Sequence, residues 1–314
     1  MTRVCILFHS NFAPCKRWST ISAPRRAVFE TLRAFGKLRV SVIIPTFNRA
    51  PLLRETLASV LGQTRAAFEI LVVDDGSTDD TCAMLACEFP QVQVHRIAHA
   101  GQGAARNVGI AQARGDAIAF LDSDDLWDAR FIECTSAALE NSSRAGFAYC
   151  DYGMFEESRT LNAQMLAREH KQGGDLFPQL LESDFLCTGA LLIRRECFET
   201  VGAFDPALPP VEDWDMWLRL ARQYQATCVD APLVHIRVNS AHASRNPQIV
   251  YARNLELVRK LRREFPDDAR RFRRELRRHE KQFHLALANY FRVKRRPLPA
   301  LKHYAYFFAA RILG

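Results

Sequence analysis

The stretch AIAFLDSDDLW at residues 117–127 is an apolar run that ends abruptly in an acidic turn. The run Ala117–Leu121 predicts a buried strand, and Asp122, Asp124 and Asp125 follow at its end. Carboxylates this close repel one another unless a cation lies between them, and hard oxygen ligands suit Mg²⁺ or Mn²⁺. A divalent metal that carries a diphosphate would fill that place. The alternative is a solvated acidic turn that caps the next helix.

Strands and helices alternate upstream of this turn. Val40–Ile44 is a β-branched run typical of a strand buried on both faces, and we expect Pro45 to end it. Ala50–Leu61 has apolar residues at helical spacing, and we expect Ser77 or Thr78 to cap the next helix. The other predicted elements are helices around Met84–Leu85 and at Gly101–Arg114, and strands at Ile70–Val73 and Val92–Arg96. This alternation predicts βαβ units and a parallel sheet.

Polar clusters follow several of the predicted strands. Phe47–Asn48, Asp74–Asp75 and Asp122–Asp125 all come where a strand ends. Ligands of parallel sheets bind outside the carboxyl ends of the strands, so we expect these side chains at one edge of the sheet. Turn chemistry explains each cluster separately, because Asp and Asn are favoured in turns, but it explains the shared edge less well. The sequence therefore favours a binding edge.

The glycines of Gly101–Gln102–Gly103 suggest a dinucleotide site, which we exclude. Position 106 is arginine where the third glycine of GxGxxG would stand, and the motif follows the third strand instead of the first. Arg106 and Asn107 admit two interpretations of equal weight. They are either a cation and an amide beside a phosphate-binding edge, or a surface helix residue and a helix cap.

A second acidic cluster, Glu212–Asp213–Trp214–Asp215, opens a predicted helix after predicted strands at Phe147–Tyr152 and Ala190–Ile193. The apolar residues at helical spacing are Trp214, Trp217, Leu218 and Ala221. Asp213 either caps this helix and complements its dipole, or serves as a general base whose pKa is raised beside apolar rings. The residues alone leave both interpretations open.

Composition places the chain among ordinary globular proteins. It has 314 residues, 48% of them hydrophobic, and a net charge of +8, which suits an acidic partner such as a nucleotide diphosphate, an anionic lipid or a nucleic acid. The nine cysteines form no disulfide or zinc spacing, which favours reduced thiols in a cytosolic compartment. No apolar run is long enough to span a bilayer, and Val4–Phe8 is too short for a signal peptide. We therefore expect a soluble or peripheral cytoplasmic protein.

The two ends of the chain are less regular. Residues 1–39 form an N-terminal extension whose expected elements are a short strand at Val4–Phe8 and a basic helix at Arg25–Leu38. Arg and Lys are dense over residues 253–296, where apolar residues recur at helical spacing. A solvated helical face is favoured there over nucleic-acid binding, because no recognised nucleic-acid motif accompanies the charge. The aromatic stretch Leu298–Leu313 either packs on the domain or lies in a membrane interface.

Several segments in a fixed order carry a resemblance to a known family. They are VSVIIPTFN (40–48), ILVVDDGST (70–78), GQGAARNVG (101–109), FLDSDD (120–125) and EDWDMWLRL (212–220). Over about residues 40–244 the chain resembles family 2 glycosyltransferases of the GT-A fold. The resemblance implies an α/β, Rossmann-like architecture with a mostly parallel central sheet flanked by helices. The nucleotide-binding half would be residues 40–125 and the acceptor half residues 126–244, whereas the N-terminal extension 1–39 and the helical basic region 245–314 lie outside the resemblance.

The resemblance also implies how a nucleotide base is held. Pro45 and Phe47 would flank the base, with Thr46 between them and the Phe47 ring stacked on the base. Asp75 would read the base edge by accepting a hydrogen bond from a uracil N–H. The expected donor is therefore a nucleotide-diphosphate sugar, with UDP as the expected nucleotide.

The same resemblance assigns the acidic turn to the diphosphate. Asp122 would lie near the ribose and diphosphate, and Ser123 and Arg106 would belong to the same donor-binding set. Asp124 would ligate the divalent metal, Mn²⁺ or Mg²⁺. The cofactor implied is thus a metal ion that is bound together with the sugar donor.

The resemblance makes Asp213 the general base and exposes one departure from the family pattern. Many relatives carry a late histidine that helps to bind metal or diphosphate, and here Asn239 stands where it is expected, although Arg237 matches. His235 or His242 would be the substitutes. Asp213 would deprotonate an acceptor hydroxyl, and a single displacement without a covalent nucleophile would invert the sugar configuration.

The function expected is an inverting sugar transfer to a glycan or lipid-linked acceptor, as in cell-surface polysaccharide synthesis. The alternative is a catalytically inactive module of the same fold that binds a nucleotide sugar or acts as a scaffold. We expect a cytoplasmic protein with peripheral contact at the inner face of the membrane through its C-terminal region. No nucleic-acid partner is expected.

Overall fold

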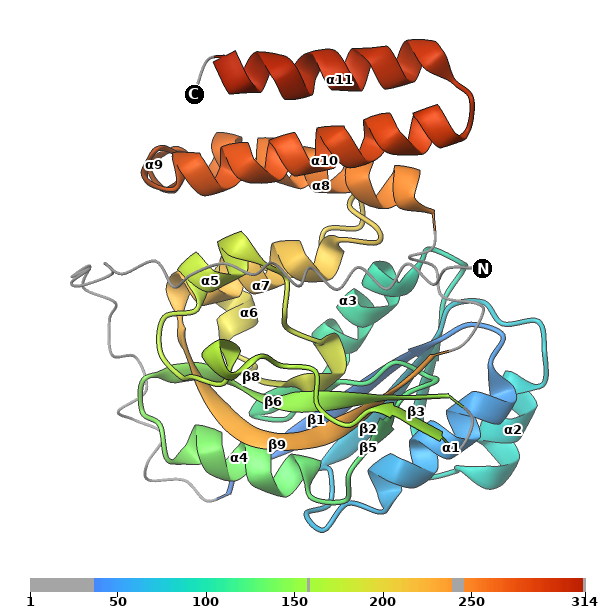
Figure 1. Cartoon of the computed structure of the whole chain (residues 1–314). Coiled ribbons are helices and arrows are strands. Elements are labelled where there is room, and N and C mark those ends of the chain that lie inside the picture. The colour runs from blue at the N-terminus through green and yellow to red at the C-terminus, as the bar shows by residue number, and fades with distance from the viewer. Residues whose placement is uncertain (1–36, 157–158, 239–245, 313–314) are drawn as a thin grey trace.

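The first half of the chain alternates strands and helices as predicted. The computed structural model describes residues 37–156, 159–238 and 246–312. The elements are β1 (Val40–Thr46), α1 (Ala50–Leu61), β2 (Glu69–Asp74), α2 (Thr81–Glu88), β3 (Gln93–Arg96), α3 (Gln102–Gln112) and β4 (Ala117–Phe120). The four strands pair in parallel in the order β3-β2-β1-β4. The apolar runs seen in the sequence are the buried central strands, because helices cover both faces of the sheet (Figure 1).

The prediction that Pro45 ends the first strand is wrong. β1 continues through Pro45 to Thr46, which pair with Val73 and Asp74 of β2. On the other side, the pairing of β1 with β4 ends at Ile43, opposite Phe120. Beyond Ile43 the strand therefore has one paired neighbour, and a residue without a backbone N–H is tolerated there as it is on an edge strand.

The predicted cap of the second helix is also wrong. α2 begins at Thr81 with Asp80 in the capping position, and neither Ser77 nor Thr78 caps it. Both residues are bound elsewhere: Ser77 N donates to Asp74 Oδ1 at 2.9 Å, and Thr78 N donates to Asn48 Oδ1 at 2.7 Å. The turn after β2 is therefore fixed by side chains of the two strand ends, which leaves the helix to start later.

The second half of the described chain continues the sheet with mixed directions. Its elements are β5 (Leu126–Trp127), α4 (Phe131–Glu140), β6 (Ala145–Glu156), β7 (Arg159–Asn162), α5 (Phe177–Glu182), β8 (Leu191–Arg194), α6 (Cys197–Val201), α7 (Glu212–Gln223) and β9 (Gln225–Arg237). The full order is β3-β2-β1-β4-β8-β6-β9-β5, with β7 beside β6. β8 runs antiparallel to β4 and β6, whereas β6 and β9 are parallel. The sheet is entirely parallel in its first half and mixed in its second half, and the long, curved strand β9 gives it a curled shape (Figure 1).

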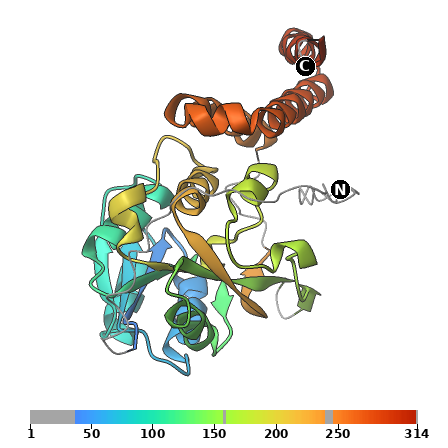
Figure 2. The same ribbon diagram turned by 90° about the vertical axis from the view of Figure 1, so that its left-hand side faces the viewer.

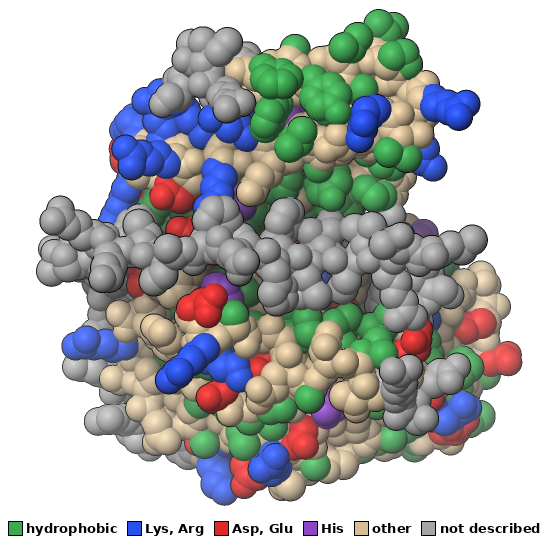
Figure 3. Space-filling model, viewed as in Figure 1, with side chains coloured by type: hydrophobic (Ala, Val, Ile, Leu, Met, Phe, Trp, Pro, Cys, Tyr) green, Lys and Arg blue, Asp and Glu red, His purple; other side chains and the backbone are tan. Residues whose placement is uncertain are grey.

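The basic C-terminal region is helical, as predicted. It forms a layer on one side of the sheet domain from α8 (Pro247–Glu264), α9 (Pro266–Arg271), α10 (Arg273–Val293) and α11 (Pro297–Ile312), with α11 outermost (Figures 1 and 2). Apolar residues of α8 and α10 share one buried cluster with α5 and α7. Lys and Arg side chains gather at one end of this layer (Figure 3). None of the helices in the described ranges is both long and apolar enough to cross a bilayer.

Some sequence predictions fall outside the described residues. The strand expected at Val4–Phe8 does so entirely, and the helix expected at Arg25–Leu38 does so except for Lys37 and Leu38. Asn239 and His242, two residues discussed for the late ligand, also lie outside.

Candidate active site

The polar clusters predicted at the strand ends share one edge of the sheet. β1, β2 and β4 are neighbours in the sheet, and Asp75 N donates to Thr46 O at 2.8 Å just past the end of β2. The first turn of α7 joins the same edge through Arg106 of α3, which contacts both Asp122 and Glu212. Acids that are far apart in the sequence therefore converge. The alternation of strands and helices predicted this for the clusters that follow the strands, but not for the first turn of α7.

Phe47 and Asp75 lie together with a third side chain that the sequence did not indicate, His99. The Phe47 and His99 rings are stacked with their centroids 4.3 Å apart, and His99 Nδ1 lies 2.8 Å from Asp75 Oδ2. The Asp75 carboxylate also accepts hydrogen bonds from the backbone N–H of Ala100 and Gly101, at 2.7 and 2.9 Å. Gly101 has a φ of +93°, a conformation that favours glycine, and this lets the backbone fold over the carboxylate.

Arg106 is a buried counter-ion rather than a surface residue. Only 2% of it is exposed, and its Nη2 lies 2.7 Å from Asp122 Oδ1, while Nη1 lies 4.0 Å from Glu212 Oε1. Asn107 takes neither of the two roles considered for it: its side chain brackets the backbone of Phe204, accepting from N at 2.8 Å and donating to O at 2.9 Å. α3 thus fixes both the acidic turn and the loop that leads into α7.

The carboxylates of the acidic turn have different surroundings. Asp124 is buried and its Oδ2 pairs with Arg49 Nη1 at 2.7 Å. Asp125 is also buried and accepts a hydrogen bond from Arg237 N at 2.9 Å. Burial raises the pKa of Asp125 well above its usual range, and the neighbouring charges of Asp122 and Asp124 add to the shift. The Asp122 side chain is 30% exposed and is the most open of the three.

Arg237 holds the acidic turn from the side of β9. Besides its backbone contact to Asp125, its Nε donates to Asp124 O at 2.9 Å, and its guanidinium lies 4.6 Å from the centre of the Phe155 ring. Of the substitutes considered for a late metal ligand, His235 lies on β9 in register with Leu126 of β5. Arg237 therefore shapes the turn. The sequence does not indicate this role, because Arg237 lies 112 positions after Asp125.

The donor atoms on this edge fit a metal that binds together with a diphosphate. Within residues 37–156, 159–238 and 246–312, no three His, Cys, Asp or Glu side chains lie close enough to hold an ion by themselves. Mg²⁺ and similar cations are usually held by one or two carboxylates together with substrate phosphates. The turn of Asp122 and Asp124 provides a partial set of this kind, with hard oxygen atoms only.

The first turn of α7 carries the candidate base. Burial raises the pKa of Asp213, the positive charge of Arg106 opposes the shift, and the negative charge of Asp122 adds to it. Asp213 Oδ1 also accepts a hydrogen bond from Trp214 N at 2.8 Å, so it supports the first turn as well. The pKa of buried Glu212 is raised by burial and by the charge of Asp213. The two interpretations of Asp213 as helix support and as candidate base are thus compatible.

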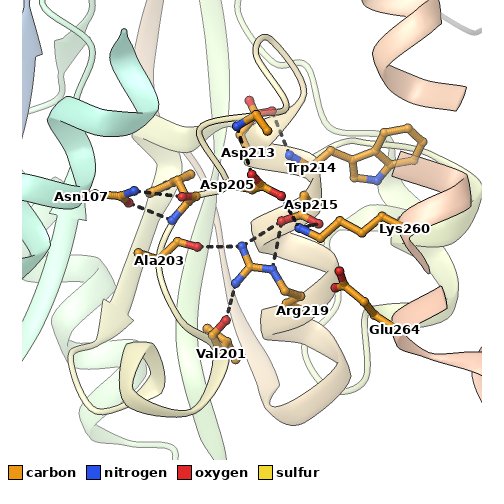
Figure 4. A network of polar contacts seen from close by, with 12 residues as sticks. Asn107, Val201, Ala203, Asp205, Asp213, Trp214, Asp215, Arg219, Lys260 and Glu264 are labelled. Carbon is orange, nitrogen blue, oxygen red and sulfur yellow. Dashed lines mark hydrogen bonds and ion pairs between the residues drawn. The ribbon is translucent and has the colours of Figure 1, made fainter. Parts of the chain in front are cut away.

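Helix α7 is anchored to the C-terminal layer by a network of charges (Figure 4). Lys260 of α8 contacts Asp215 Oδ1 at 2.9 Å and Asp205 Oδ2 at 2.8 Å. Arg219 Nε donates to Asp215 Oδ2 at 2.9 Å, and its Nη2 donates to Ala203 O at 2.9 Å. Asp215 lies two positions after Asp213, so α8 helps to fix the turn that carries the candidate base.

Comparison with known families identifies a sequence family. The model for glycosyl transferase family 2 matches residues 41–202, just over half of the chain. An uncharacterised glycosyltransferase of Rickettsia conorii, RC0461, is 31% identical over 205 residues, which are 64% of this chain and 33% of that protein. The chain thus spans about one third of the length of that relative.

Solved structures match the fold over most of the chain. S. aureus TarS 1–349 in complex with UDP-GlcNAc has a TM-score of 0.62 at 17% identity, covering 87% of this chain and 89% of that one. The mannosyltransferase PcManGT from Pyrobaculum calidifontis, in complex with GDP-Man and Mn²⁺, has a TM-score of 0.57 at 20% identity, covering 96% and 80%. These matches confirm the predicted GT-A-like architecture.

Proposed function

This chain belongs to glycosyl transferase family 2, and we propose that it moves a sugar from a nucleotide diphosphate to a hydroxyl group with inversion. The observation that carries the proposal is the convergence on Arg106 of Asp122 from the acidic turn and Glu212 from α7, with Asp213 beside them. Such an edge brings a diphosphate-binding turn next to a candidate base. A sugar between them would meet both, as one displacement requires.

We expect UDP as the nucleotide, held in the segment Pro45–Phe47 and by Asp75. Phe47 is 39% exposed just past the end of β1, and Asp75 is buried at the same end of the sheet. TarS binds UDP-GlcNAc and PcManGT binds GDP-Man in the structures that match this fold, which supports a nucleotide sugar without deciding the base.

His99 makes the two contacts expected of the base. Its ring stacks on Phe47 and its Nδ1 lies against Asp75, whereas two rings 4.3 Å apart leave no space for a third between them. We therefore expect the base to displace His99, whose side chain is 61% exposed and free to turn outward. On this account His99 competes weakly with the donor for the Phe47 ring.

The diphosphate would lie at the acidic turn, with Asp122 and Ser123 near it and Asp124 on the metal. When bound, Mn²⁺ or Mg²⁺ would neutralise charge on the leaving diphosphate as a Lewis acid. The chain's own contribution is to hold the turn in shape: Arg49 pairs with Asp124, Arg237 binds the backbone of the turn, and Arg106 binds Asp122. These contacts preorganise the oxygen atoms before the donor arrives.

Asp213 would remove the proton from the attacking hydroxyl of the acceptor. The raised pKa of Asp213 lies closer to neutral pH than that of an ordinary exposed aspartate, so its carboxylate is a better proton acceptor. The hydroxyl oxygen forms the new bond to the anomeric carbon, and the nucleotide diphosphate leaves with the bonding electron pair from the opposite face. The product therefore has the inverted configuration.

The acceptor is expected to be a glycan or a lipid-linked glycan. A lipid-linked acceptor would bring the chain to the cytoplasmic face of a membrane, with peripheral contact through residues 245–314. This region packs on the sheet domain through α8, whose Lys260 reaches the acids beside α7. A membrane-bound helical layer would therefore hold the transferase edge at a fixed distance from the acceptor.

The direct test is the release of nucleoside diphosphate from a panel of UDP- and GDP-sugars by the purified chain with Mn²⁺. We expect one donor to be turned over slowly without acceptor and to raise the melting temperature. Binding without turnover in the presence of diverse acceptor glycans would favour the inactive binding module. The absence of both binding and turnover for every donor would overturn the proposal.

A further inference from the structure

The outermost helix, α11, has its apolar face turned outward. Leu298, Leu301 and Phe308 are 79%, 63% and 52% exposed, and with Ala305 they recur at helical spacing along one side. Its other side packs on α10: Ala300 is buried, and Tyr304 Oη donates to Asn289 Oδ1 at 2.8 Å. A surface helix normally turns its polar face toward water and its apolar face toward the core. Its outward face therefore needs a partner other than water.

A basic cavity of about 500 Å³ lies where α11 meets α10. Its cationic lining residues are Arg273, Arg274, Arg277, Arg278 and Lys281 of α10, and none of its lining residues within 37–156, 159–238 and 246–312 carries a carboxylate. Phe307 of α11 forms part of the same wall. A guanidinium group can donate two parallel hydrogen bonds to the oxygens of one phosphate. A cavity lined by several arginines therefore suits a phosphate group.

The apolar face and the cavity form one continuous surface, the α10–α11 surface, because Phe307 in the cavity wall is adjacent to exposed Phe308. In Figure 3 a group of Lys and Arg side chains lies at the left end of the helical layer, and hydrophobic side chains lie along the upper helix. Anionic phosphate next to hydrocarbon is the chemistry of a phospholipid surface. Helices that lie in such an interface combine apolar and basic side chains in this way.

We propose that the α10–α11 surface docks the chain on a bilayer of anionic phospholipids. The cations of the cavity bind lipid phosphates, and Leu298, Leu301 and Phe308 enter the boundary between headgroups and acyl chains. The proposal deepens the membrane contact included in the proposed function, by naming the residues and the lipid class. α11 lies along the surface and does not cross it, in keeping with the lack of a spanning helix among the described residues.

Charge and the apolar row of α11 together favour an anionic bilayer over a second copy of the chain or a nucleic acid as the partner of this surface. A second copy of the chain in a two-fold dimer would place the same basic patch against itself, which like charges oppose. A nucleic acid would satisfy the cations but would leave the apolar row of α11 in water. An anionic bilayer satisfies both parts of the surface at once.

The test is sedimentation of the full chain with vesicles of phosphatidylcholine alone or with equimolar phosphatidylglycerol. We expect binding to the anionic vesicles only. The cavity variant Arg273→Gln/Arg274→Gln/Lys281→Gln should bind on the order of 10²-fold more weakly, because each cation near an anionic surface contributes about fivefold. The matched control Arg130→Gln/Arg144→Gln/Arg168→Gln removes three exposed arginines from the sheet domain and should bind as the parent does.

A second variant, Leu298→Gln/Leu301→Gln/Phe308→Gln, keeps all charges and removes the apolar face. It should sediment less with anionic vesicles while its donor turnover in solution stays unchanged, because none of these residues belongs to the proposed transferase site. Parent chain that stays in the supernatant with anionic vesicles would overturn the proposal, as would equal loss in the cavity and control variants. A dimer that is lost in the apolar-face variant, with no vesicle binding, would assign the surface to a second copy. Donor turnover is measured in the same preparations, so a failure of docking is distinct from a failure of the transferase proposal.

Discussion

Two basic regions of this chain contrast in what surrounds their cations. At the sheet edge, Arg106 is 2% exposed and Arg49 pairs with a buried carboxylate, so each cation faces acids of the chain itself. In the cavity between α10 and α11, Arg273, Arg274 and Lys281 line a wall in which the described part of the chain places no carboxylate. A buried cation fixes the acids around it, whereas an exposed cluster of cations favours an anion from outside.

The contrast assigns different roles to two groups of cations, which the net charge of +8 does not distinguish. The inner cations hold the acidic turn and the first turn of α7 in one arrangement, which is a catalytic task in the proposed transferase. The outer cations would bring that arrangement to a membrane.

The largest effect is expected for Asp213→Asn. Loss of the base should lower kcat by about 10²–10⁴-fold while donor binding persists, because the amide keeps the shape but cannot accept the proton. Turnover is measured by nucleoside diphosphate release, and donor affinity by calorimetry. The exposed Asp267→Asn is the control and should turn over as the parent does. A kcat within twofold of the parent would remove Asp213 as the base.

The next effect concerns the pH dependence that Arg106 imposes. The raised pKa of Asp213 means that protonation disables the base at a higher pH than for an ordinary aspartate, so kcat falls as pH drops through that pKa. Arg106 lowers this pKa, so Arg106→Gln should move the acidic limb of the kcat profile to higher pH. Arg130→Gln, which removes an exposed arginine, should leave it in place. A limb that does not move in Arg106→Gln would show that the charge does not act on the base.

Salt should act differently on the two regions. The Debye length shrinks from about 10 Å at 0.1 M to about 3 Å at 1 M, so exposed cations lose most of their long-range attraction while buried pairs lose little. Sedimentation with anionic vesicles should therefore fall steeply over this range, whereas the acidic limb set by Arg106 should stay nearly constant. Vesicle binding that resists salt in the parent would mean that the apolar face of α11 dominates.

The smallest effect is expected for His99→Ala. If the imidazole competes with the base for the Phe47 ring, its removal should tighten UDP binding by a few-fold, in line with roughly 0.5–1.5 kcal/mol for an aromatic pair. Calorimetric titration of UDP measures the change. Weaker binding would instead make His99 a part of the base site that stays in place beside the nucleotide.

The part of the fold that the sequence predicted best is the one built from local pattern. Ala50–Leu61 was predicted with the bounds that α1 has, because its apolar spacing and Pro51 at its start act within a few residues. The clusters at the ends of β1, β2 and β4 were placed on one edge for a similar reason, since parallel strands present their carboxyl ends together. The short strands β5 and β7 and the long strand β9 carried no comparable pattern.

The contacts that shape the candidate site were hidden because they join distant residues. Arg237 binds Asp125 across 112 positions, and Lys260 reaches Asp215 from a helix of the C-terminal layer. An arginine or lysine in a basic segment gives no local indication of which acid it will meet. The placement of His99 on Phe47 likewise depends on how the loop after β3 folds back over Asp75.

The most direct measurement of the central claim is calorimetric titration of UDP into the purified chain with and without Mn²⁺. The claim is that this edge binds a nucleotide diphosphate together with a metal. Mn²⁺ should therefore lower the Kd for UDP about tenfold or more, which corresponds to about 1.4 kcal/mol. Asp124→Asn should remove that gain. Equal affinity with and without Mn²⁺ in the parent chain, or no binding of UDP or GDP under either condition, would contradict the account.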